Sequence, residues 1–203
     1  VRSRRQRQMC IRDRKEDGGE VYFKNLFDSC SELMQLIVNA PQPIIAQVDG
    51  VATAAGCQLV ASCDLALASL ESKFATPGVN LGLFCSTPMV ALSRNVNKKN
   101  AMEMLLTGDF INADRAKEIG LINNTVLKEE LTLEVDKLAE KIASKSTMTV
   151  STGKKAFYAQ VEMGLSEAYK YTSKTMTDNL LKSDAKEGIN AFLEKRSPDW
   201  KDK

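Results

Sequence analysis

Hydrophobic positions recur in steps of three and four over residues 19–39, and this period predicts an amphipathic helix. Pro41 and Pro43 stop it, because proline donates no backbone hydrogen bond and disfavours helical geometry in the residue before it. The run PIIAQVD comes next and predicts a short, mostly apolar strand. The apolar positions of the helix are Phe23, Leu26, Phe27, Cys30, Leu33, Met34 and Ile37.

Small residues crowd the next stretch, VDGVATAAGCQLVASCD, which spans residues 48–64. A buried strand would carry larger, β-branched residues there, and a solvated loop would carry more polar ones. A helical spacing resumes after Ala54, so we expect a helix that begins among the small residues and ends near Asp64. The small residues are Gly50, Ala52, Ala54, Ala55 and Gly56.

The rest of the chain adds short strands and then mostly helices. LALAS and LINNTV predict strands, whereas SKFATPGVNLGLF predicts an irregular segment because proline and glycine interrupt it. Asn112 and Gly120 are residue types that cap the two ends of a helix. Together these patterns predict an α/β fold with an α-rich end. The other expected helices span residues 99–106, 128–145, 149–162, 165–182 and 184–196.

Two side-chain patterns belong to the predicted C-terminal helices. Asp184 and Glu187 have the spacing of a capping box, in which two side chains satisfy the first backbone N–H groups of a helix. The charge runs Lys154–Lys155 and Glu194–Arg196 are expected to form solvated faces.

Composition excludes several classes of protein. The 203 residues are 43% hydrophobic, enough for one sizeable core, and the formal net charge of +2 favours neither nucleic acid nor an anionic membrane as a partner. No apolar run reaches the ~18 residues of a membrane span. The absence of histidine excludes histidine-based triads, a histidine general base and histidine metal ligands, and we expect no metal site. Five cysteines without CxxC spacing suit reduced, buried thiols in an intracellular compartment.

The first fourteen residues, VRSRRQRQMCIRDR, are Arg-rich and carry Asp13 as their only acid. They lack a clear amphipathic period, and they resemble translated sequencing-adapter DNA. We therefore interpret residues 1–14 as a non-native or artefactual leader. A remnant of a mitochondrial transit peptide and a basic interaction arm are the alternatives.

Three separated blocks resemble the enoyl-CoA hydratase/isomerase (crotonase) superfamily, in its order and at its spacing. The resemblance implies an α/β fold: a crotonase-type ββα spiral core over residues 15–126, with its N-terminal part missing, and an α-helical C-terminal trimerisation region over 127–203. The first block is most similar to a mitochondrial group, which implies a location in the mitochondrial matrix. The blocks are PIIAQVDGVATAAGCQLVASCDLALAS with FATPGVNLGLF, AMEMLLTGDFINADRAKEIGLINNTV, and KEGINAFLEKRSPDW.

The resemblance implies an acyl-CoA thioester as ligand or substrate, with no further cofactor. In the family two backbone N–H groups bind the thioester oxygen; one matches Ala55, and the other belongs to a segment upstream of residue 15. The physical chemistry agrees, because a helix that begins at residues 54–56 directs free N–H groups and its positive dipole end at a ligand. Such a donor is worth roughly 3–4 kcal/mol in acyl chemistry. The alternative is that the small residues only permit close helix–strand packing.

The chain departs from the hydratases of this family at both glutamate positions. Those enzymes place two glutamates around one water, because one must accept its proton while the other positions it or donates a proton. Gln58 occupies the first position and Gly78 the second, so neither residue can take a proton. The other expected pocket residues are not carboxylates either: Asn80, Cys85 and Ser86.

Nearby acids and thiols do not replace the glutamates. Asp49 precedes a glycine turn and Asp64 follows the predicted helix, so we expect structural roles for both. Cys57 and Cys85 have no histidine to activate them, which favours buried apolar thiols over covalent nucleophiles.

The C-terminal block adds further expectations from the resemblance. A basic residue at the position of Lys195 approaches the CoA phosphates from a neighbouring subunit in relatives, and Phe192 would pack beside the nucleotide. The alternative is an exposed lysine and a core phenylalanine on the last helix. The resemblance also implies a homotrimer or a hexamer, with Trp200 at a subunit contact.

Three functions stay open. The first is an acyl-CoA-binding protein of fatty-acid metabolism that has lost both hydratase glutamates, with oxyanion-assisted chemistry such as decarboxylation or thioester cleavage. The second is a non-catalytic acyl-CoA sensor or assembly subunit. The third is an ordinary enoyl-CoA hydratase, an activity that we predict to be weak or absent.

Overall fold

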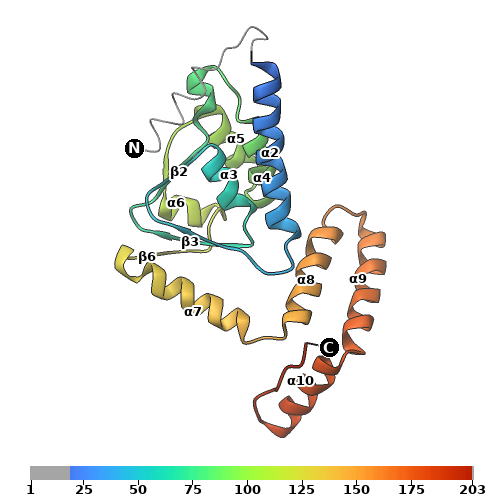
Figure 1. The fold of residues 1–203 in the computed structure, drawn as a ribbon. Helices are drawn as coiled ribbons and strands as arrows, with labels where there is room; N and C mark the ends of the chain where they lie inside the picture. Colours follow the sequence, from blue (N-terminus) through green and yellow to red (C-terminus); the bar gives the residue numbers. More distant parts are fainter. Residues whose placement is uncertain (1–18, 203) are drawn as a thin grey trace.

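A computed structural model describes residues 19–202 and arranges them as a mixed α/β core followed by a helical region (Figure 1). The expected leader, residues 1–14, lies outside the described residues. The strands are β1 Ile45–Val48, β2 Val51–Thr53, β3 Leu65–Ser69, β4 Lys73–Ala75, β5 Ile111–Asn112 and β6 Asn124–Val126. The helices are α2 Glu20–Asn39, α3 Ala55–Ser62, α4 Ser86–Asn95, α5 Lys98–Thr107, α6 Ala113–Glu118, α7 Leu131–Ala143, α8 Thr147–Gln160, α9 Leu165–Leu180 and α10 Ser183–Glu194, with short 3₁₀ helices η1 Pro77–Leu81 and η2 Lys128–Glu130.

The strands form two small sheets whose order follows a repeated ββα unit. β1, β3 and β6 lie in parallel in one sheet, and in the other β2 is parallel to β4 while β4 is antiparallel to β5. β1 and β2 therefore lie in different sheets, and β3 and β4 pair with them one turn later. This stacking agrees with the ββα spiral expected from the sequence.

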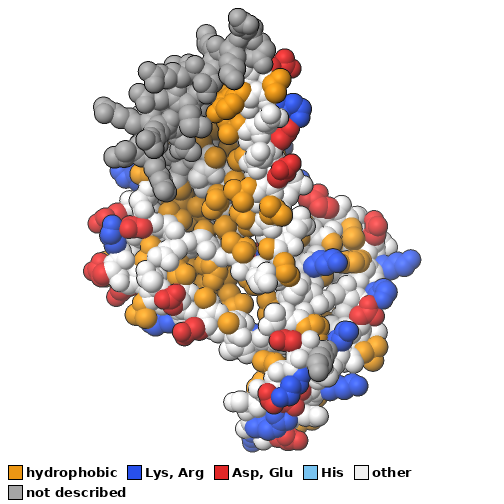
Figure 2. All heavy atoms as spheres, viewed as in Figure 1, with side chains coloured by type: hydrophobic (Ala, Val, Ile, Leu, Met, Phe, Trp, Pro, Cys, Tyr) orange, Lys and Arg blue, Asp and Glu red, His pale blue; other side chains and the backbone are white. Residues whose placement is uncertain are grey.

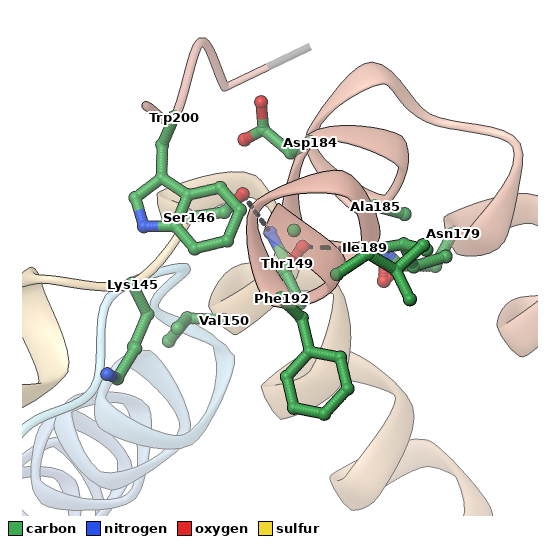
Figure 3. Close-up of a pocket in the computed structure, with 12 residues that line it drawn as sticks. Lys145, Ser146, Thr149, Val150, Asn179, Asp184, Ala185, Ile189, Phe192 and Trp200 are labelled. Carbon is green, nitrogen blue, oxygen red and sulfur yellow. Dashed lines mark hydrogen bonds between the residues drawn. The ribbon is translucent and has the colours of Figure 1, made fainter. Parts of the chain in front are cut away.

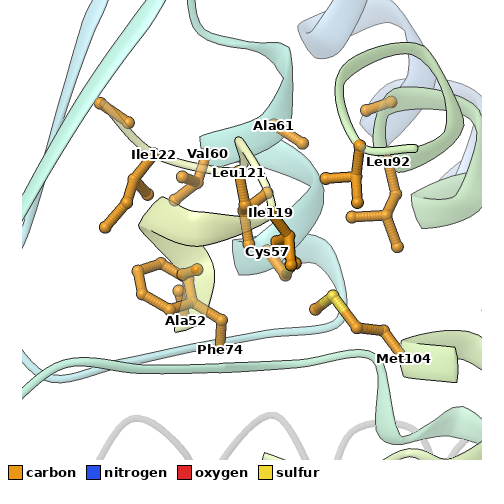
Figure 4. Packing of buried hydrophobic residues seen from close by; sticks show 14 of the residues in the cluster. Ala52, Cys57, Val60, Ala61, Phe74, Leu92, Met104, Ile119, Leu121 and Ile122 are labelled. Atoms are coloured by element: carbon orange, nitrogen blue, oxygen red, sulfur yellow. The ribbon is translucent and has the colours of Figure 1, made fainter. Parts of the chain in front are cut away.

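Helix α3 runs through the centre of the core. Its residues Cys57 and Val60 are almost fully buried, in one cluster with Phe74 of β4, Leu92 of α4 and Met104 of α5 (Figure 4). Close packing on all these sides leaves α3 little freedom to shift or rotate. The core therefore restricts the direction in which its first turn can point.

Most of the predicted elements are confirmed. The helix expected over residues 19–39 is α2, the helix expected from the small residues is α3, and LALAS is β3. The capping residues of α6 are also confirmed: Asn112 accepts a hydrogen bond from the backbone N–H of Arg115, and Gly120 follows with φ 82°.

Several elements were not predicted, for local reasons. The segment expected to be irregular contains β4 and η1, and the small-residue stretch contains β2. Strands of three residues are too short to show an alternating pattern. The segment around Pro88 forms α4, because a proline near the start of a helix occupies a position whose N–H has no intrahelical acceptor.

Two expectations for the C-terminal helices are wrong. α10 begins at Ser183, so Asp184 and Glu187 do not form a capping box; the carboxylate of Asp184 instead accepts from the backbone N–H groups of Lys201 and Asp202. Lys154 is not on a solvated face either. Its side chain is only 7% exposed, because it reaches the carboxylate of Asp64.

The surface is unevenly divided between apolar and charged side chains. Hydrophobic side chains gather along α2 and over the neighbouring core, whereas charged ones spread over the rim and the C-terminal helices (Figure 2). Within residues 19–202, no helix combines the length and hydrophobicity needed to cross a bilayer.

Candidate functional site

A strained turn leads into α3. The N–H of Ala54 extends the β2–β4 pairing by donating to the carbonyl of Ala75 (3.0 Å). Ala54 then takes φ 48° and ψ −114°, a conformation that residues with a Cβ rarely adopt. Its carbonyl accepts from the N–H of Gln58 (2.9 Å), so the turn opens directly into the helix.

The first turn of α3 leaves a backbone donor free. Ala55 and Gly56 are exposed, and across residues 19–202 the N–H of Ala55 donates to no other group. A Cβ added at Gly56 would meet nothing within 4 Å, so close packing against a strand does not explain why this residue is small. The space in front of the helix is therefore open, as far as the described residues define it.

This helix end suits an oxygen atom that carries or develops negative charge. Free N–H groups and the positive end of the helix dipole act in the same direction there. A donor fixed by a rigid helix needs no reorganisation when charge develops on the oxygen, and such preorganisation is what makes an oxyanion site effective. The small side chains before the helix leave room for that approach.

The side chain of Gln58 lies one turn into α3 and is engaged with α2. It is 4% exposed, and its Oε1 accepts a hydrogen bond from the thiol of Cys30 at 3.6 Å. The contact joins α2 to α3 across 28 residues of sequence. An amide in this position can orient a neighbouring group by hydrogen bonding, but it has no basic site for a proton.

The backbone around Gly78 is closed by the loop that follows η1. The N–H of Gly78 donates to the sulfur of Cys85 (3.3 Å), and its carbonyl accepts from the N–H of Leu83 (3.0 Å). A Cβ added at Gly78 would stand 2.7 Å from the carbonyl oxygen of Leu83 and 2.8 Å from the sulfur of Cys85. No side chain fits here unless the loop moves.

The other two pocket residues expected from the sequence, Asn80 and Ser86, are exposed, and each donates to a backbone carbonyl. Asn80 donates from Nδ2 to the carbonyl of Gly108 at 3.5 Å, and the hydroxyl of Ser86 donates to the carbonyl of Phe84 at 3.3 Å. Gly78 and Asn80 thus lie in η1, Cys85 caps α4 and Ser86 is its first residue, while Ala55 and Gln58 lie on α3.

The thiols around α3 behave as apolar groups, as expected. Cys57, Cys63 and Cys85 are buried and free, and Cys30 is partly buried. Burial, with a smaller contribution from the neighbouring Cys85, raises the pKa of Cys57 to about 12. A thiol with so high a pKa is almost entirely protonated near neutral pH and is a poor nucleophile. Within residues 19–202, no cluster of acids and thiols could hold a metal ion.

Two acids near α3 have structural partners, which confirms the roles predicted for them. Asp49 accepts from the hydroxyl of Ser69 (3.2 Å) and pairs with Lys128 (2.9 Å), whose hydrogen bond lowers the pKa of the Asp49 carboxyl. Asp64 accepts from the ammonium group of Lys154 at 2.7 Å and from the hydroxyl of Tyr158 at 2.9 Å.

The C-terminal site residues lie apart from α3, on α10 (Figure 1). Phe192 is 81% exposed, which contradicts the alternative of a core phenylalanine, and Lys195 is an exposed residue at the end of the helix with φ 54°. Phe192 borders a hollow of about 570 Å³ between α8, α9 and α10 (Figure 3). The indole N–H of Trp200 donates to the carbonyl of Ser144 (2.9 Å) within the same chain, at the rim of this hollow.

Sequence reasoning missed three groups that shape this region. Cys30 holds Gln58, the carbonyl of Leu83 crowds Gly78, and Lys154 neutralises Asp64. The partners in the first and third cases are 28 and 90 residues apart, so no local spacing relates them. For the crowding around Gly78, the one available signal was the glycine itself, in a segment without a helix or strand pattern.

A family profile and several curated proteins match most of this chain. The profile of the enoyl-CoA hydratase/isomerase family matches residues 14–203. The mitochondrial enoyl-CoA hydratase domain-containing protein 3 of Rattus norvegicus is 55% identical over 182 residues, which are 90% of this chain and 61% of that protein. Its counterpart from Homo sapiens is 52% identical over 190 residues, 94% of this chain and 63% of that protein. The chain therefore spans about three fifths of the length of these relatives.

Solved structures of related proteins also match most of this chain. The crystal structure of human enoyl-coenzyme A hydratase domain-containing protein 3 superposes with a TM-score of 0.89 at 53% identity, covering 94% of this chain and 75% of that one. An enoyl-CoA hydratase from Mycobacterium smegmatis gives a TM-score of 0.86 at 50% identity, covering 88% of this chain and 70% of that one.

Proposed function

The chain belongs to the enoyl-CoA hydratase/isomerase family, and from this premise we propose that it binds an acyl-CoA thioester at the start of α3 without acting as a paired-glutamate hydratase. The family resemblance and the crotonase-type α/β fold expected from the sequence are both confirmed. The observation that carries the proposal is the free N–H of the exposed residue Ala55, together with the absence of a carboxylate at positions 58 and 78.

The binding half of the proposal rests on geometry. A thioester carbonyl that approaches α3 along its axis meets the N–H of Ala55 and no bulky side chain from Ala54 or Gly56. Both the dipole and the donor favour an oxygen that becomes more negative, as it does when a thioester enolises. The donor is a backbone group, so alanine serves as well as glycine at position 55.

The argument against hydration rests on Gln58 and Gly78. Adding water to a double bond requires a group that takes a proton from that water. Gln58 has no such group and is bonded to Cys30. Gly78 has no side chain, and the contacts with Leu83 and Cys85 leave no volume for one. Chemistry in which the substrate's own carboxylate leaves, or a held water attacks the thioester, would still benefit from the Ala55 donor.

A non-catalytic acyl-CoA sensor or assembly subunit is the second candidate, and the C-terminal helices favour it. Large apolar side chains on α9 and α10 are more than half exposed, which is typical of surfaces that contact another protein. We propose that they join copies of the chain into a homotrimer or hexamer, with Lys195 near the CoA of a neighbouring copy. The side chains are Leu165, Tyr169, Met176, Leu180, Phe192 and Leu193.

The cellular location agrees with acyl-CoA metabolism. Three relatives that are 52–55% identical carry mitochondrial names, and the expected mitochondrial location is confirmed at that level. Placement in the matrix and a role in fatty-acid metabolism are part of the proposal.

The test measures binding and turnover together. The protein is incubated with crotonyl-CoA and with malonyl-type acyl-CoAs, while thermal stability and product formation are followed. We expect stabilisation by at least one acyl-CoA and little or no hydration of crotonyl-CoA. Efficient hydration would overturn the interpretation of Gln58 and Gly78, and no stabilisation by any acyl-CoA would overturn the binding site.

A variant without the backbone N–H of residue 55 tests whether this group binds the acyl-CoA. Ala55→Pro removes the N–H, and proline is well tolerated at the first position of a helix. We expect the Kd for acyl-CoA to rise about two- to tenfold, the usual contribution of one hydrogen bond. Ala55→Gly keeps the N–H and is the matched control. Circular dichroism of both variants checks that α3 is intact.

A further inference from the structure

A buried polar cluster joins α8 to the core. The ammonium group of Lys154 donates to the carboxylate of Asp64 (2.7 Å) and to the carbonyls of Ile37 and Gln42 (2.9 Å each). The hydroxyl of Tyr158, one turn further along α8, donates to the other oxygen of Asp64 (2.9 Å). The Lys154 and Asp64 side chains are only 7% and 15% exposed.

Every polar atom of this cluster has a partner. Lys154 uses all three of its donors, and Asp64 accepts from Lys154, from Tyr158 and from the backbone N–H of Ile44 (2.7 Å). Burial and the hydrogen bond with Asp64 raise the pKa of Tyr158, so this hydroxyl stays protonated as a donor. A buried charge pair is secure only when its remaining hydrogen-bonding sites are filled, and here they are.

The cluster lies where three core elements end or begin. Ile37 is in the last turn of α2, Ile44 immediately precedes β1, and Asp64 immediately follows the residue that caps α3. The contact between Cys30 and Gln58 joins α2 to α3 a second time. α8 therefore holds the C-terminal ends of two helices that are already connected to each other.

We propose that Lys154 and Tyr158 are positioning residues for α3, which hold it through Asp64 so that its first N–H groups point into the candidate site. The helical C-terminal region thereby controls the affinity of the core for its ligand. The effect on acyl-CoA affinity rests on the proposed function; the positioning of α3 does not.

The geometry requires a local effect. Loss of the ammonium group leaves a buried carboxylate and two carbonyls short of donors, and the core adjusts at the ends of α2 and α3 to expose them to water. Because α3 is a short, rigid helix, a tilt at its last turn also moves its first turn. α5, which contributes no atom to the cluster, is expected to keep its protection.

The experiment compares neighbouring lysines of α8 in the full chain. Lys154→Met removes the buried charge, while Lys155→Met removes an exposed charge one residue later and is the matched control. Amide hydrogen exchange is followed for peptides that cover α3 and, separately, α5. We expect Lys154→Met to speed exchange in α3 by about tenfold, as local opening does, with α5 and the Lys155→Met variant close to wild type.

Binding completes the test. The Kd for crotonyl-CoA should rise in Lys154→Met and not in Lys155→Met. Tyr158→Phe removes one hydrogen bond without removing a charge, so it should speed exchange in α3 by less than Lys154→Met does. If Lys154→Met does not fold, Tyr158→Phe takes its place in the comparison. Equal acceleration in α3 and α5 would overturn the proposal, because it would mean uniform loss of stability. The exchange comparison decides the positioning claim even if wild type binds no acyl-CoA of any kind, a result that would overturn only the proposed function.

Discussion

Ala54 holds a backbone conformation that alanine rarely adopts, at φ 48° and ψ −114°. Two hydrogen bonds keep it there: its N–H donates to Ala75, and its carbonyl accepts from Gln58. A residue so restrained stores strain on the order of 1–3 kcal/mol, and such residues cluster at functional sites. The strain lies immediately before the helix end that carries the proposed acyl-CoA donor, where it fixes the direction of that end.

Ala54→Gly is expected to stabilise the protein. Glycine removes the Cβ that makes this conformation costly, and part of the gain is lost to the greater entropy of glycine in the unfolded chain. We expect a net increase of about 1 kcal/mol in the free energy of unfolding, measured by urea denaturation. Ala55→Gly is the control, one residue later in α3, and should leave stability unchanged or lower it. Equal losses in both variants would contradict the strain argument.

The η1–α4 loop decides what position 78 can hold. Its backbone returns to Gly78 through the carbonyl of Leu83, and Cys85 fills the remaining space. Replacing Cys85 alone would not free the position, because the nearer obstacle is the backbone oxygen of Leu83. A glutamate at 78 would therefore require the whole loop to move, so a single substitution does not restore the second acid of a hydratase.

Gly78→Ala measures this crowding. The added Cβ would lie 2.7 Å from the oxygen of Leu83, and we expect a loss of about 1–3 kcal/mol of stability, as in other overpacked sites. Gly153→Ala is the matched control, because Gly153 lies in α8 with nothing within 4 Å of its added Cβ. It should gain about 0.5–1 kcal/mol from better helix propensity. Thermal or urea denaturation measures both changes: the stability lost in Gly78→Ala and the stability gained in Gly153→Ala.

Patterns among neighbouring residues predicted the helices and strands far better than they predicted the contacts between these elements. The 3.6-residue period located α2, and the asparagine and glycine caps located α6, because each signal lies within a few consecutive residues. The start of α3, and with it Ala55, could also be found from the small-residue run. The burial of Lys154 could not, since a charge run on a helix looks the same whether it faces water or a distant carboxylate. The crowding at Gly78 depends on the path of a loop, which no residue pattern records.

The C-terminal tail folds back on α10 through a second set of charges. Glu187 accepts two hydrogen bonds from the guanidinium of Arg196 and one from the backbone N–H of Asp199. These contacts lower the pKa of Glu187 from its ordinary 4.5 to about 2, chiefly through the hydrogen bonds with Arg196. The ring of Trp200 then packs against Gly188, where a Cβ would come within 3.2 Å of it.

Acid should weaken this tail contact within a defined pH range. Because folding depresses the pKa of Glu187, its contribution to stability is complete above about pH 4.5 and is lost as the pH falls towards 2. Glu187→Gln should therefore be less stable than wild type at pH 7, and the difference should shrink between pH 4.5 and 2. Unfolding measured across this range checks it. When Arg196→Gln is also present, the stability difference between Glu187 and Glu187→Gln should depend much less on pH. If that pH dependence is undiminished, Arg196 is not the main cause of the lowered pKa of Glu187.

The cluster around Asp64 limits how the chain can be truncated. A fragment that stops before α8 would keep the carboxylate of Asp64 with the N–H of Ile44, and would lose both the ammonium group of Lys154 and the hydroxyl of Tyr158. Such a fragment carries a negative charge that has lost both of its side-chain partners. A minimal version of the core therefore has to be redesigned at position 64, with a neutral side chain that still accepts a hydrogen bond from Ile44.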